Sequence, residues 1–285
     1  MSPFAAKNIL CPVDLSPASS TVLRWARLLA ETYRGNVTLL YADQGEWPPY
    51  LLPSRVEEMA GQARRHRAAL EEALAGLGRE TLGASVPHEV AVAEGHPVEA
   101  ILGHARTRRP DLVVMGSHGR SGIARWRLGS VAENVIRESA VPTLVVRARE
   151  GAGPRPAISQ VLCPVNFTDL SRGCLEIAAG LAGAFGARLS VMHAAEQGVS
   201  DLQAARDRLC AWVPADARGH CELVEVVRRG DAAEQILLLA REQGVDLIVL
   251  GAQRRPLLEF TTLGTTTERV TRHAESAVLV LPRST

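Results

Sequence analysis

The amino-acid sequence repeats itself. The segment ILCPVD at residues 9–14 returns as VLCPVN at residues 161–166, an offset of 152 positions that also relates residues 37–42 to residues 189–194. Farther along, DLVVMG at residues 111–116 returns as DLIVLG at residues 246–251, an offset of 135 positions. The two offsets are constant and differ by one deletion of 17 residues after the second predicted strand, so the sequence predicts two copies of one domain.

Each copy is predicted to alternate strands and helices. In the first copy, apolar runs predict strands at residues 8–13, 37–42, 86–93, 112–115 and 143–146. The stretches between them predict helices at residues 17–33, 55–77, 98–108 and 131–138, the first of them bounded by Ser16 and Gly35. Strands that are apolar throughout and separated by helices are typical of a parallel sheet covered on both faces. The predicted fold class is therefore α/β, with two tandem Rossmann-like domains.

The domain boundaries follow from the repeat. We assign residues 1–148 to domain 1, residues 149–157 to a linker rich in Gly and Pro, and residues 158–285 to domain 2. The linker is short, so the two domains are expected to lie against each other.

Composition and charge narrow the function classes. The chain has 32 Lys and Arg residues against 31 Asp and Glu, which gives no electrostatic case for binding nucleic acid or an anionic membrane. No apolar run approaches the roughly 20 residues of a membrane-spanning helix, and residues 1–16 lack the pattern of a secretory signal. We therefore expect a cytoplasmic protein. Cys11 and Cys163 lie inside strand patterns and are expected to be small buried apolar residues.

The segment with the clearest chemistry is glycine-rich. It contains Gly116, His118 and Gly119 directly after a predicted buried strand, and Gly129 and Ser130 follow where a helix is expected to begin. The glycines let the backbone approach an anion closely, and the free N–H groups and dipole of a helix start favour a phosphate. A surface turn with a serine cap is the alternative for such glycines alone. The coincidence of turn, spacing and strand-to-helix context favours phosphate binding.

Two common nucleotide motifs do not occur. The sequence has no GxxxxGK[ST], and no GxGxxG follows the first strand. A P-loop NTPase and a standard dinucleotide-binding fold are therefore not expected. The eight histidines show no HxxxH or HExxH spacing, so no metal site is predicted.

The spacing Gly-x2-Gly-x9-Gly-Ser resembles the ATP-binding signature of the universal stress protein family. The opening ILCPVDLSPAS resembles the first strand and loop of that family, and VPTLVV at residues 141–146 resembles its final strand. The resemblance covers nearly the whole chain, twice. It implies two domains like the adenine nucleotide alpha hydrolases, each a five-stranded parallel sheet with helices on both faces.

The resemblance also implies a ligand and its site. The ligand would be ATP, with Mg²⁺ accompanying the phosphates, and Asp14 would accept a hydrogen bond from the base. His118 would be a polar wall residue rather than a catalyst, because no partner acid is evident. The implied residues lie around the base, along the ribose and at the phosphates, in that order: Pro12, Val13, Asp14 and Ala42; Met115 and Gly116; His118, Gly119, Gly129, Ser130 and Val131.

The second copy departs from this pattern. Asn166 stands where the first copy has Asp14, and Arg254 stands where it has Gly119, although Gly264 and Thr265 remain. A β-carbon and a long side chain at Arg254 would restrict the turn and fill the phosphate space. We predict that domain 2 binds nucleotide weakly or not at all; a phosphate contact by Arg254 or Arg255 is the alternative.

Three functions remain open from the sequence. The first, which we favour, is a regulatory nucleotide-binding protein of the stress response, with domain 1 as the main ATP site and no catalytic residue. The second is an enzyme with slow ATP hydrolysis or self-phosphorylation, for which no base is evident. The third is an interaction scaffold without ligand. Family members pair through their final strands, so residues 143–146 and 277–281 are expected to pair within the chain, and a homodimer stays open.

Overall fold

The computed structural model of the chain describes residues 4–45, 53–117, 128–147, 156–196, 201–252, 254–257 and 260–282. The first half contains β1 (Asn8–Pro12), α1 (Pro17–Tyr33), β2 (Asn36–Asp43), α2 (Pro53–Leu82), β3 (His88–Glu94), α3 (Pro97–Arg108), β4 (Leu112–Gly116), α4 (Ser130–Glu138) and β5 (Thr143–Val146). The second half contains β6 (Gln160–Pro164), α5 (Asp169–Phe185), β7 (Arg188–Ala195), α6 (Leu202–Trp212), α7 (Ala215–His220), β8 (Leu223–Arg229), α8 (Ala232–Glu242), β9 (Leu247–Gly251), β10 (Arg254–Leu257), β11 (Phe260–Leu263), α9 (Thr265–His273) and β12 (Ala277–Leu281).

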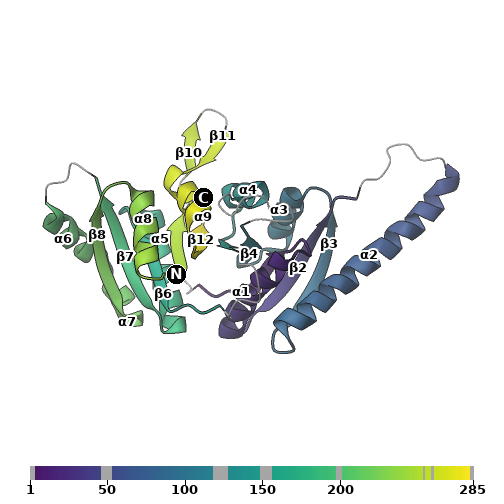
Figure 1. Cartoon of the computed structure of the whole chain (residues 1–285), viewed down its shortest axis with the longest axis horizontal. Helices are drawn as coiled ribbons and strands as arrows, with labels where there is room; N and C mark the ends of the chain where they lie inside the picture. The colour runs from purple at the N-terminus through teal and green to yellow at the C-terminus, as the bar shows by residue number, and fades with distance from the viewer. Residues whose placement is uncertain are drawn as a thin grey trace.

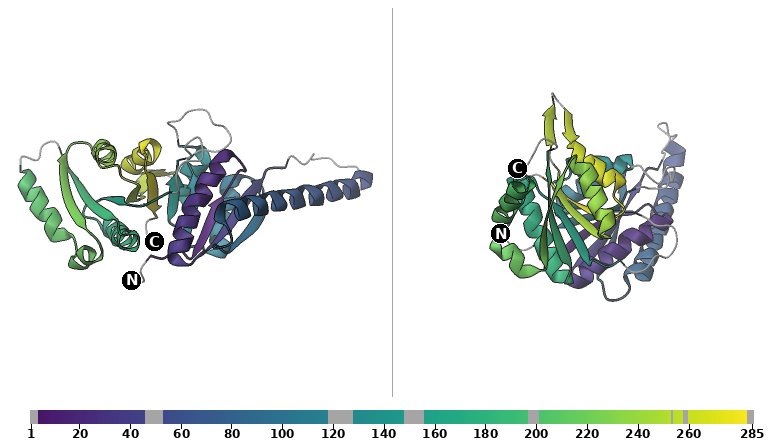
Figure 2. Two further views of the ribbon diagram at one scale, coloured as in Figure 1. Left: turned by 60° about the horizontal axis from the view of Figure 1, so that its bottom comes forward. Right: turned by 60° about the vertical axis from the view of Figure 1, so that its left-hand side comes forward.

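Five strands from each half join in one ten-stranded sheet (Figure 1), in the order β3-β2-β1-β4-β5-β12-β9-β6-β7-β8. All neighbouring strands within a half run parallel. Helices cover both faces of this sheet (Figure 2). The structure therefore confirms the predicted α/β class and the parallel five-stranded sheet of each half.

The two halves meet at the antiparallel pair β5–β12. Leu144 lies opposite Leu279, which is its own equivalent in the second copy, and Val145 and Thr143 lie opposite Val278 and Val280. Exchanging the two copies therefore leaves the set of paired residues unchanged, as at the interface of a two-fold symmetric dimer. The repeat in the sequence thus becomes a pseudo-two-fold axis through the Leu144–Leu279 pair.

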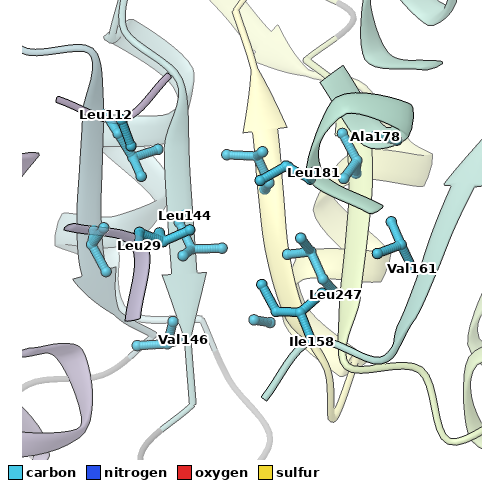
Figure 3. Packing of buried hydrophobic residues seen from close by; sticks show 14 of the residues in the cluster. Leu29, Leu112, Leu144, Val146, Ile158, Val161, Ala178, Leu181 and Leu247 are labelled. Atoms are coloured by element: carbon cyan, nitrogen blue, oxygen red, sulfur yellow. The ribbon is translucent and has the colours of Figure 1, made fainter. Parts of the chain in front are cut away.

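The apolar core forms two layers, one on each face of the sheet. One layer includes Leu112 and Leu144 from the first half and Leu247 from the second (Figure 3). Leu279 of the second half belongs to the same layer. The layer on the opposite face likewise joins Val145 of β5 to residues of β12, α8 and α9. Both layers cross the junction, so burial of apolar surface holds the two halves together as well as each half internally.

Three cysteines belong to this core. Cys11, Cys163 and Cys174 are buried, and all five cysteines of the chain are free thiols. Burial raises the pKa of Cys11 and Cys163 well above the ordinary thiol value and that of Cys174 to about 12. The prediction that Cys11 and Cys163 act as small apolar residues is confirmed.

The end of α1 corrects one detail of the sequence analysis. The left-handed residue after the helix is Arg34, with φ 54°, rather than Gly35. An added Cβ on Gly35 would lie 2.5 Å from the carbonyl oxygen of Ala6, so Gly35 is required because the backbone before β1 passes close by. In the second half the left-handed position is itself a glycine, Gly186, with φ 63°.

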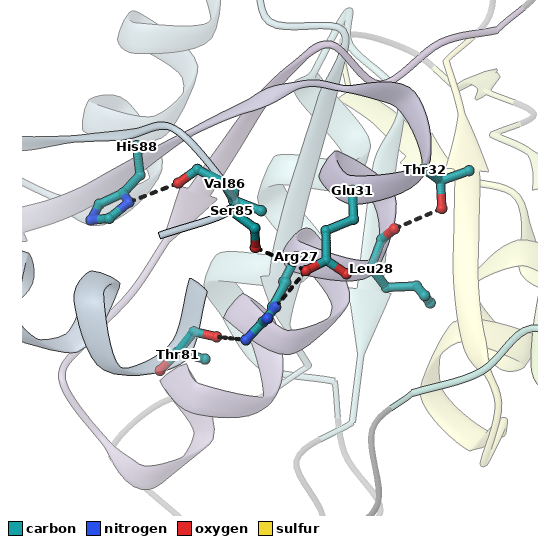
Figure 4. Close-up of polar contacts among 8 residues, drawn as sticks. All are labelled: Arg27, Leu28, Glu31, Thr32, Thr81, Ser85, Val86 and His88. Carbon is teal, nitrogen blue, oxygen red and sulfur yellow. Dashed lines mark hydrogen bonds and ion pairs between the residues drawn. The ribbon is translucent and has the colours of Figure 1, made fainter. Parts of the chain in front are cut away.

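The helix α2 is longer than predicted, running from residue 53 to residue 82 rather than from 55 to 77. Its end is fixed by polar contacts with α1 (Figure 4): Arg27 Nη1 donates to the Thr81 carbonyl at 3.2 Å, and Ser85 Oγ, just after α2, donates to Glu31 of α1 at 3.1 Å. Gly83 then turns the chain with φ 69°. These contacts join residues more than fifty positions apart, which sequence periodicity does not report.

The second half replaces α2 by the shorter helices α6 and α7, which is where the deletion of 17 residues falls. It also carries the hairpin β10–β11, which the sequence analysis did not predict. Part of the predicted linker, residues 149–155, lies outside the described residues. Within the part of the chain that the structure describes, no helix has the length and apolar character needed to cross a membrane.

Candidate functional site

A cavity of about 390 Å³ opens at the carboxyl ends of β1, β2 and β4. This is the edge of a parallel sheet at which ligands usually bind. Nine residues that the sequence analysis assigned to the site line it: Pro12, Val13, Asp14, Ala42, Met115, Gly116, Gly129, Ser130 and Val131. The other two, His118 and Gly119, lie outside the described residues. Segments from four places in the first half are thus brought around one space.

The structure adds wall residues that the sequence analysis missed. Ala18, Ser19 and Val22 enter the wall from α1, and Tyr41 and Gln44 enter it from the end of β2. No sequence motif marks the residues of α1 that face the sheet. The position of α1 directly after the Asp14 loop was the signal that could have predicted their place in the wall. The remaining additional residues are Leu40, Pro97, Ile101, Ser117 and Ala132.

The loop after β1 is built around the Asp14 carboxylate. Its Oδ1 accepts hydrogen bonds from Ser16 N at 3.0 Å, Ser16 Oγ at 2.6 Å and Ser19 Oγ at 3.0 Å. Leu15 between them takes the left-handed conformation, with φ 59°. Asp14 is therefore both a turn residue and part of the cavity wall.

Another part of the cavity wall is the start of α4. Gly129 is the N-cap and offers no side chain, and the first helical bond runs from Glu133 N to the Gly129 carbonyl at 3.0 Å. The amides of Ser130, Val131 and Ala132, all in the cavity wall, therefore have no acceptor within the helix. These three N–H groups have no hydrogen-bond acceptor among the described residues, and together with the positive end of the helix dipole they make this part of the cavity attractive to an anion.

The backbone between β4 and α4 fixes the position of that helix start. Ser117 N donates to the Val146 carbonyl at 2.8 Å, and Gly129 N donates to the Ser117 carbonyl at 2.8 Å. Ser117 is buried. These two bonds hold the amino end of α4 beside the end of β4, and so they place the helix amides at the mouth of the cavity.

The charges around the cavity are sparse. Asp14, in the loop after β1, is the one carboxylate among the described lining residues. Among the described residues, no group of three or more His, Cys, Asp or Glu is arranged to hold a metal ion. The described wall therefore offers an apolar body, one carboxylate and the backbone donors at the start of α4.

The second half has an equivalent but smaller cavity of about 210 Å³. Gly264 is again an N-cap without a side-chain bond, here for α9. The wall contains the counterparts of all nine residues above: Pro164, Val165, Asn166, Ala194, Leu250, Gly251, Gly264, Thr265 and Thr266. The scaffold of the site is thus present twice.

Leu170 narrows the second cavity. It stands at the position of Ala18, and an added Cβ on Gly251 would lie only 2.5 Å from Leu170 Cγ, so the leucine already fills the space over that glycine. Gly251 is the counterpart of Gly116. In the first cavity the same wall position carries only the methyl group of Ala18.

His193 further alters the second cavity, where it replaces Tyr41. Its Nδ1 donates to the Val165 carbonyl at 3.0 Å, since a carbonyl can only accept. The Phe167 ring packs on His193 with centroids 4.4 Å apart, and Trp212 meets Phe167 edge-on at 5.7 Å. The Val165 carbonyl beside the cavity thus already accepts a hydrogen bond from His193.

The segment after β9 departs from the sequence prediction. Arg254, predicted to sit in a degenerate glycine loop, instead begins β10, which pairs with β11 in an antiparallel hairpin. The backbone at Arg254 is therefore a strand rather than the turn that was expected, and the side chain of Arg254, which was expected to fill the phosphate space, lies outside the described part of the structure. The β-branched Thr261 and Thr262 beside Phe260 were the signal for a strand.

Comparison with known proteins identifies a family. The sequence model of the universal stress protein family matches residues 5–147 and 158–282. The chain is 26% identical over 298 residues to the universal stress protein Rv2623 of Mycobacterium tuberculosis, covering 97% of each chain. It is 30% identical over 143 residues, 50% of this chain and 82% of the relative, to the universal stress protein MJ0531 of Methanocaldococcus jannaschii.

Solved structures agree on the fold. A universal stress protein from Archaeoglobus fulgidus superimposes with a TM-score of 0.70 at 21% identity, covering 99% of this chain and all of the other. A protein from Pseudomonas aeruginosa described as a universal stress protein superimposes with a TM-score of 0.71 at 21% identity, covering 98% of this chain and 94% of the other. At this identity the similarity establishes the tandem architecture alone.

Proposed function

We propose that this chain, which belongs to the universal stress protein family, binds an adenine nucleotide in the cavity of its first half and acts as a nucleotide-dependent regulatory protein. One observation carries the proposal. The nine described residues expected at the site come from four separate segments and line a single cavity whose wall includes helix-start amides that have no acceptor within α4. Its volume of about 390 Å³ lies in the range of small-molecule sites.

The proposed orientation follows from the polarity of the wall. The base lies between the loop after β1 and the end of β2, where Val13, Asp14 and Ala42 offer backbone groups and a carboxylate acceptor. The ribose passes Met115 and Gly116, and the phosphates meet the amides of Ser130 and its neighbours. ATP is the nucleotide we propose, with Mg²⁺ accompanying its phosphates, and His118 and Gly119 would complete the phosphate end.

The second cavity is proposed to bind nucleotide weakly or not at all. Leu170 fills the space over Gly251, and His193 occupies the Val165 carbonyl that a base would otherwise meet. If Leu170 or His193 moved aside for a ligand, the contact of Leu170 with Gly251 or of His193 with Phe167 would be lost. One nucleotide per chain is therefore the expected stoichiometry.

Regulation rather than catalysis is the role that these residues support best. A general base for hydrolysis has to lie within hydrogen-bond reach of the attacking water at the γ-phosphate. Among the described lining residues the single carboxylate is Asp14, whose Oδ1 already accepts hydrogen bonds from Ser16 and Ser19, and in the proposed orientation Asp14 meets the base. A regulatory protein requires only that nucleotide binds one conformation more tightly than another.

Calorimetry of the full chain tests the proposal. Protein stripped of ligand is titrated with ATP and Mg²⁺, and heat that saturates near one nucleotide per chain is expected. Mass spectrometry of denatured, unstripped protein would identify any nucleotide that copurifies. An absence of heat at millimolar ATP would overturn the proposal. ATP turnover well above that of a variant unable to bind nucleotide would replace regulation by slow hydrolysis.

A further inference from the structure

Arg272 in α9 contacts carboxylates from both halves of the molecule. Its Nη2 lies 2.8 Å from Glu268 of α9 and 3.5 Å from Glu133 of α4. All three side chains are about one-third exposed. The Glu133 contact is therefore an ion pair across the junction of the two halves, shared with a second pair inside α9.

The two carboxylates occupy equivalent places. Glu133 and Glu268 are 135 positions apart, and each is the acidic residue in the first turn of its helix. The first residues of α4 line the first cavity, and those of α9 line the second. Arg272 thus joins the first turns of the two helices whose amino ends face the two cavities.

Further contacts hold α9 to the first half. Arg147, just after β5, donates from Nη2 to the carbonyl of Arg272 itself. A basic side chain on the carbonyls at the end of a helix is favourable because of the helix dipole. Domain 1 therefore contacts Arg272 through both its side chain and its backbone.

The hairpin β10–β11 continues this connection. β11 lies beside α4 (Figure 1), and it leads through Gly264 directly into α9. The hairpin, which occupies the segment where the second half was expected to have a glycine-rich loop, thus lies against α4, the helix that begins at the first cavity. Because β11 contacts α4 and runs directly into α9, a change in how firmly α9 is held to α4 also changes how firmly β11 is held.

The contact breaks the pseudo-two-fold symmetry. Arg137 is the counterpart of Arg272, and symmetry would pair it with Glu268. Instead, Arg137 contacts Asn134 and Glu138 of its own helix, and within the described residues it makes no ion pair with the second half. Of these two equivalent arginines, Arg272 is the one that bridges the halves.

We propose that Arg272 couples nucleotide binding in the first cavity to the ordering of α9 and the β10–β11 hairpin. The inference rests on the proposed function, because the signal is the phosphate charge at the amino end of α4. Phosphates there place negative charge one turn from Glu133 and draw the guanidinium of Arg272 toward the first half. Because Arg147 holds the carbonyl of the same residue, α9 and the hairpin are docked more firmly.

Linkage fixes the reciprocal effect. If nucleotide strengthens the docking of α9, then docking of α9 must strengthen nucleotide binding by the same factor. The pair is partly exposed, so the factor is small, about two- to fivefold, and it decreases as ionic strength rises.

Hydrogen exchange of the full chain measures the coupling. ATP with Mg²⁺ is expected to slow amide exchange of peptides from α9 and the hairpin at least twofold in the natural chain. In Arg272→Gln this response is expected to disappear, with ATP binding weakened about two- to fivefold by calorimetry. Arg137→Gln is the matched control, since it removes the equivalent arginine, and it should keep the full response.

The outcomes separate the inference from the function on which it rests. If the natural chain gives no binding heat, the proposed function fails and the coupling fails with it. If ATP binds but slows exchange equally in Arg272→Gln and in the natural chain, the coupling alone is overturned. A circular dichroism melt of Arg272→Gln within a few degrees of the natural chain establishes that a lost response is not due to unfolding. If Arg272→Gln does not fold, Glu133→Gln removes the same pair from the other side and must lose the same response.

Discussion

The two cavities of the molecule stand on the same scaffold but differ nearly twofold in volume, about 390 Å³ against about 210 Å³. Both lie at the ends of equivalent strands, and both end at a helix whose N-cap is a glycine. The difference comes from a few side chains that enter the second cavity, above all Leu170 and His193. The second half therefore keeps the strands, the loop and the helix start that surround the cavity, while side chains fill part of the cavity itself.

The largest effect is expected from transferring the obstacle to the first cavity. Ala18→Leu places the side chain of Leu170 at its equivalent position, over Gly116. Loss of ATP affinity by about 100-fold or more is expected, about 2.7 kcal/mol, because the side chain and the ribose cannot share one space. Calorimetry measures it. Ser20→Leu, next but one on the same helix and not in the wall, is the control and should bind normally. Unchanged binding by Ala18→Leu would show that the ligand lies elsewhere.

The reverse exchange should open the second cavity. Leu170→Ala is expected to add a weak second site, seen as a stoichiometry that rises from one toward two at millimolar ATP, with an affinity at least tenfold above that of the natural second cavity. The gain is limited because His193 still occupies the Val165 carbonyl. The double variant with His193→Tyr should bind more tightly than the single one. If neither variant gains binding, the hairpin backbone rather than the wall closes the second site.

A smaller effect is expected at the residue that differs in charge. Asp14→Asn gives the first cavity the amide of Asn166 and keeps an oxygen for the bonds from Ser16 and Ser19. ATP affinity should fall about fivefold, about 1 kcal/mol, because one acceptor loses its charge. A titration with ATP and with GTP distinguishes recognition of the base from a general loss. An equal loss for both nucleotides would contradict a base contact by Asp14.

The smallest effect concerns the helices that flank the cavities. Asp231 caps α8 by accepting from Glu234 N at 2.9 Å, whereas its counterpart His96 caps α3 through Nδ1 at 3.3 Å. The bond from Glu234 N, followed by that from Arg269, holds the pKa of Asp231 below its usual value of 3.8. A depressed pKa means that the ionised cap stabilises the fold above the unfolded pKa and loses that contribution as pH falls through the folded value.

Asp231→Ala should therefore lower stability by about 1 kcal/mol at pH 7 and by clearly less below pH 3.8. Thermal melts of both proteins at several pH values measure this difference. His96→Ala is the matched variant in the first half. A difference between the natural chain and Asp231→Ala that stays constant down to pH 3 would contradict the role of the ionised cap.

Much of the fold could be predicted because its signals are local. Apolar runs and helical periodicity gave the order of strands and helices in the first copy, and a strand that is apolar on both faces has few alternatives to the middle of a parallel sheet. The repeat then assigned the same order to the second copy. The ends of α2 and the hairpin were missed. Arg27 and Thr81 meet only after folding, and the hairpin lies in a segment that was expected to be a loop.

The candidate site was predictable to the extent that it consists of backbone. Glycines after β4 and before α4, and the turn at Asp14, are requirements on the main chain that a sequence states directly. The wall contributed by Ala18 and Tyr41 was missed, because a helix face and a strand end become a wall only when the sheet brings them together. The same limit hid Leu170, whose effect depends on its distance from Gly251.

By itself, the sequence determined that the chain is built twice from one α/β unit and that only the first copy keeps every glycine of the phosphate segment, because both are statements about neighbours along the chain. Only the tertiary structure decided that Leu144 meets Leu279 at a pseudo-two-fold axis, that Leu170 fills the second cavity, and that Arg272 rather than Arg137 joins the two halves. These depend on side chains from distant segments competing for the same few ångströms, and that competition is settled by packing and charge in three dimensions.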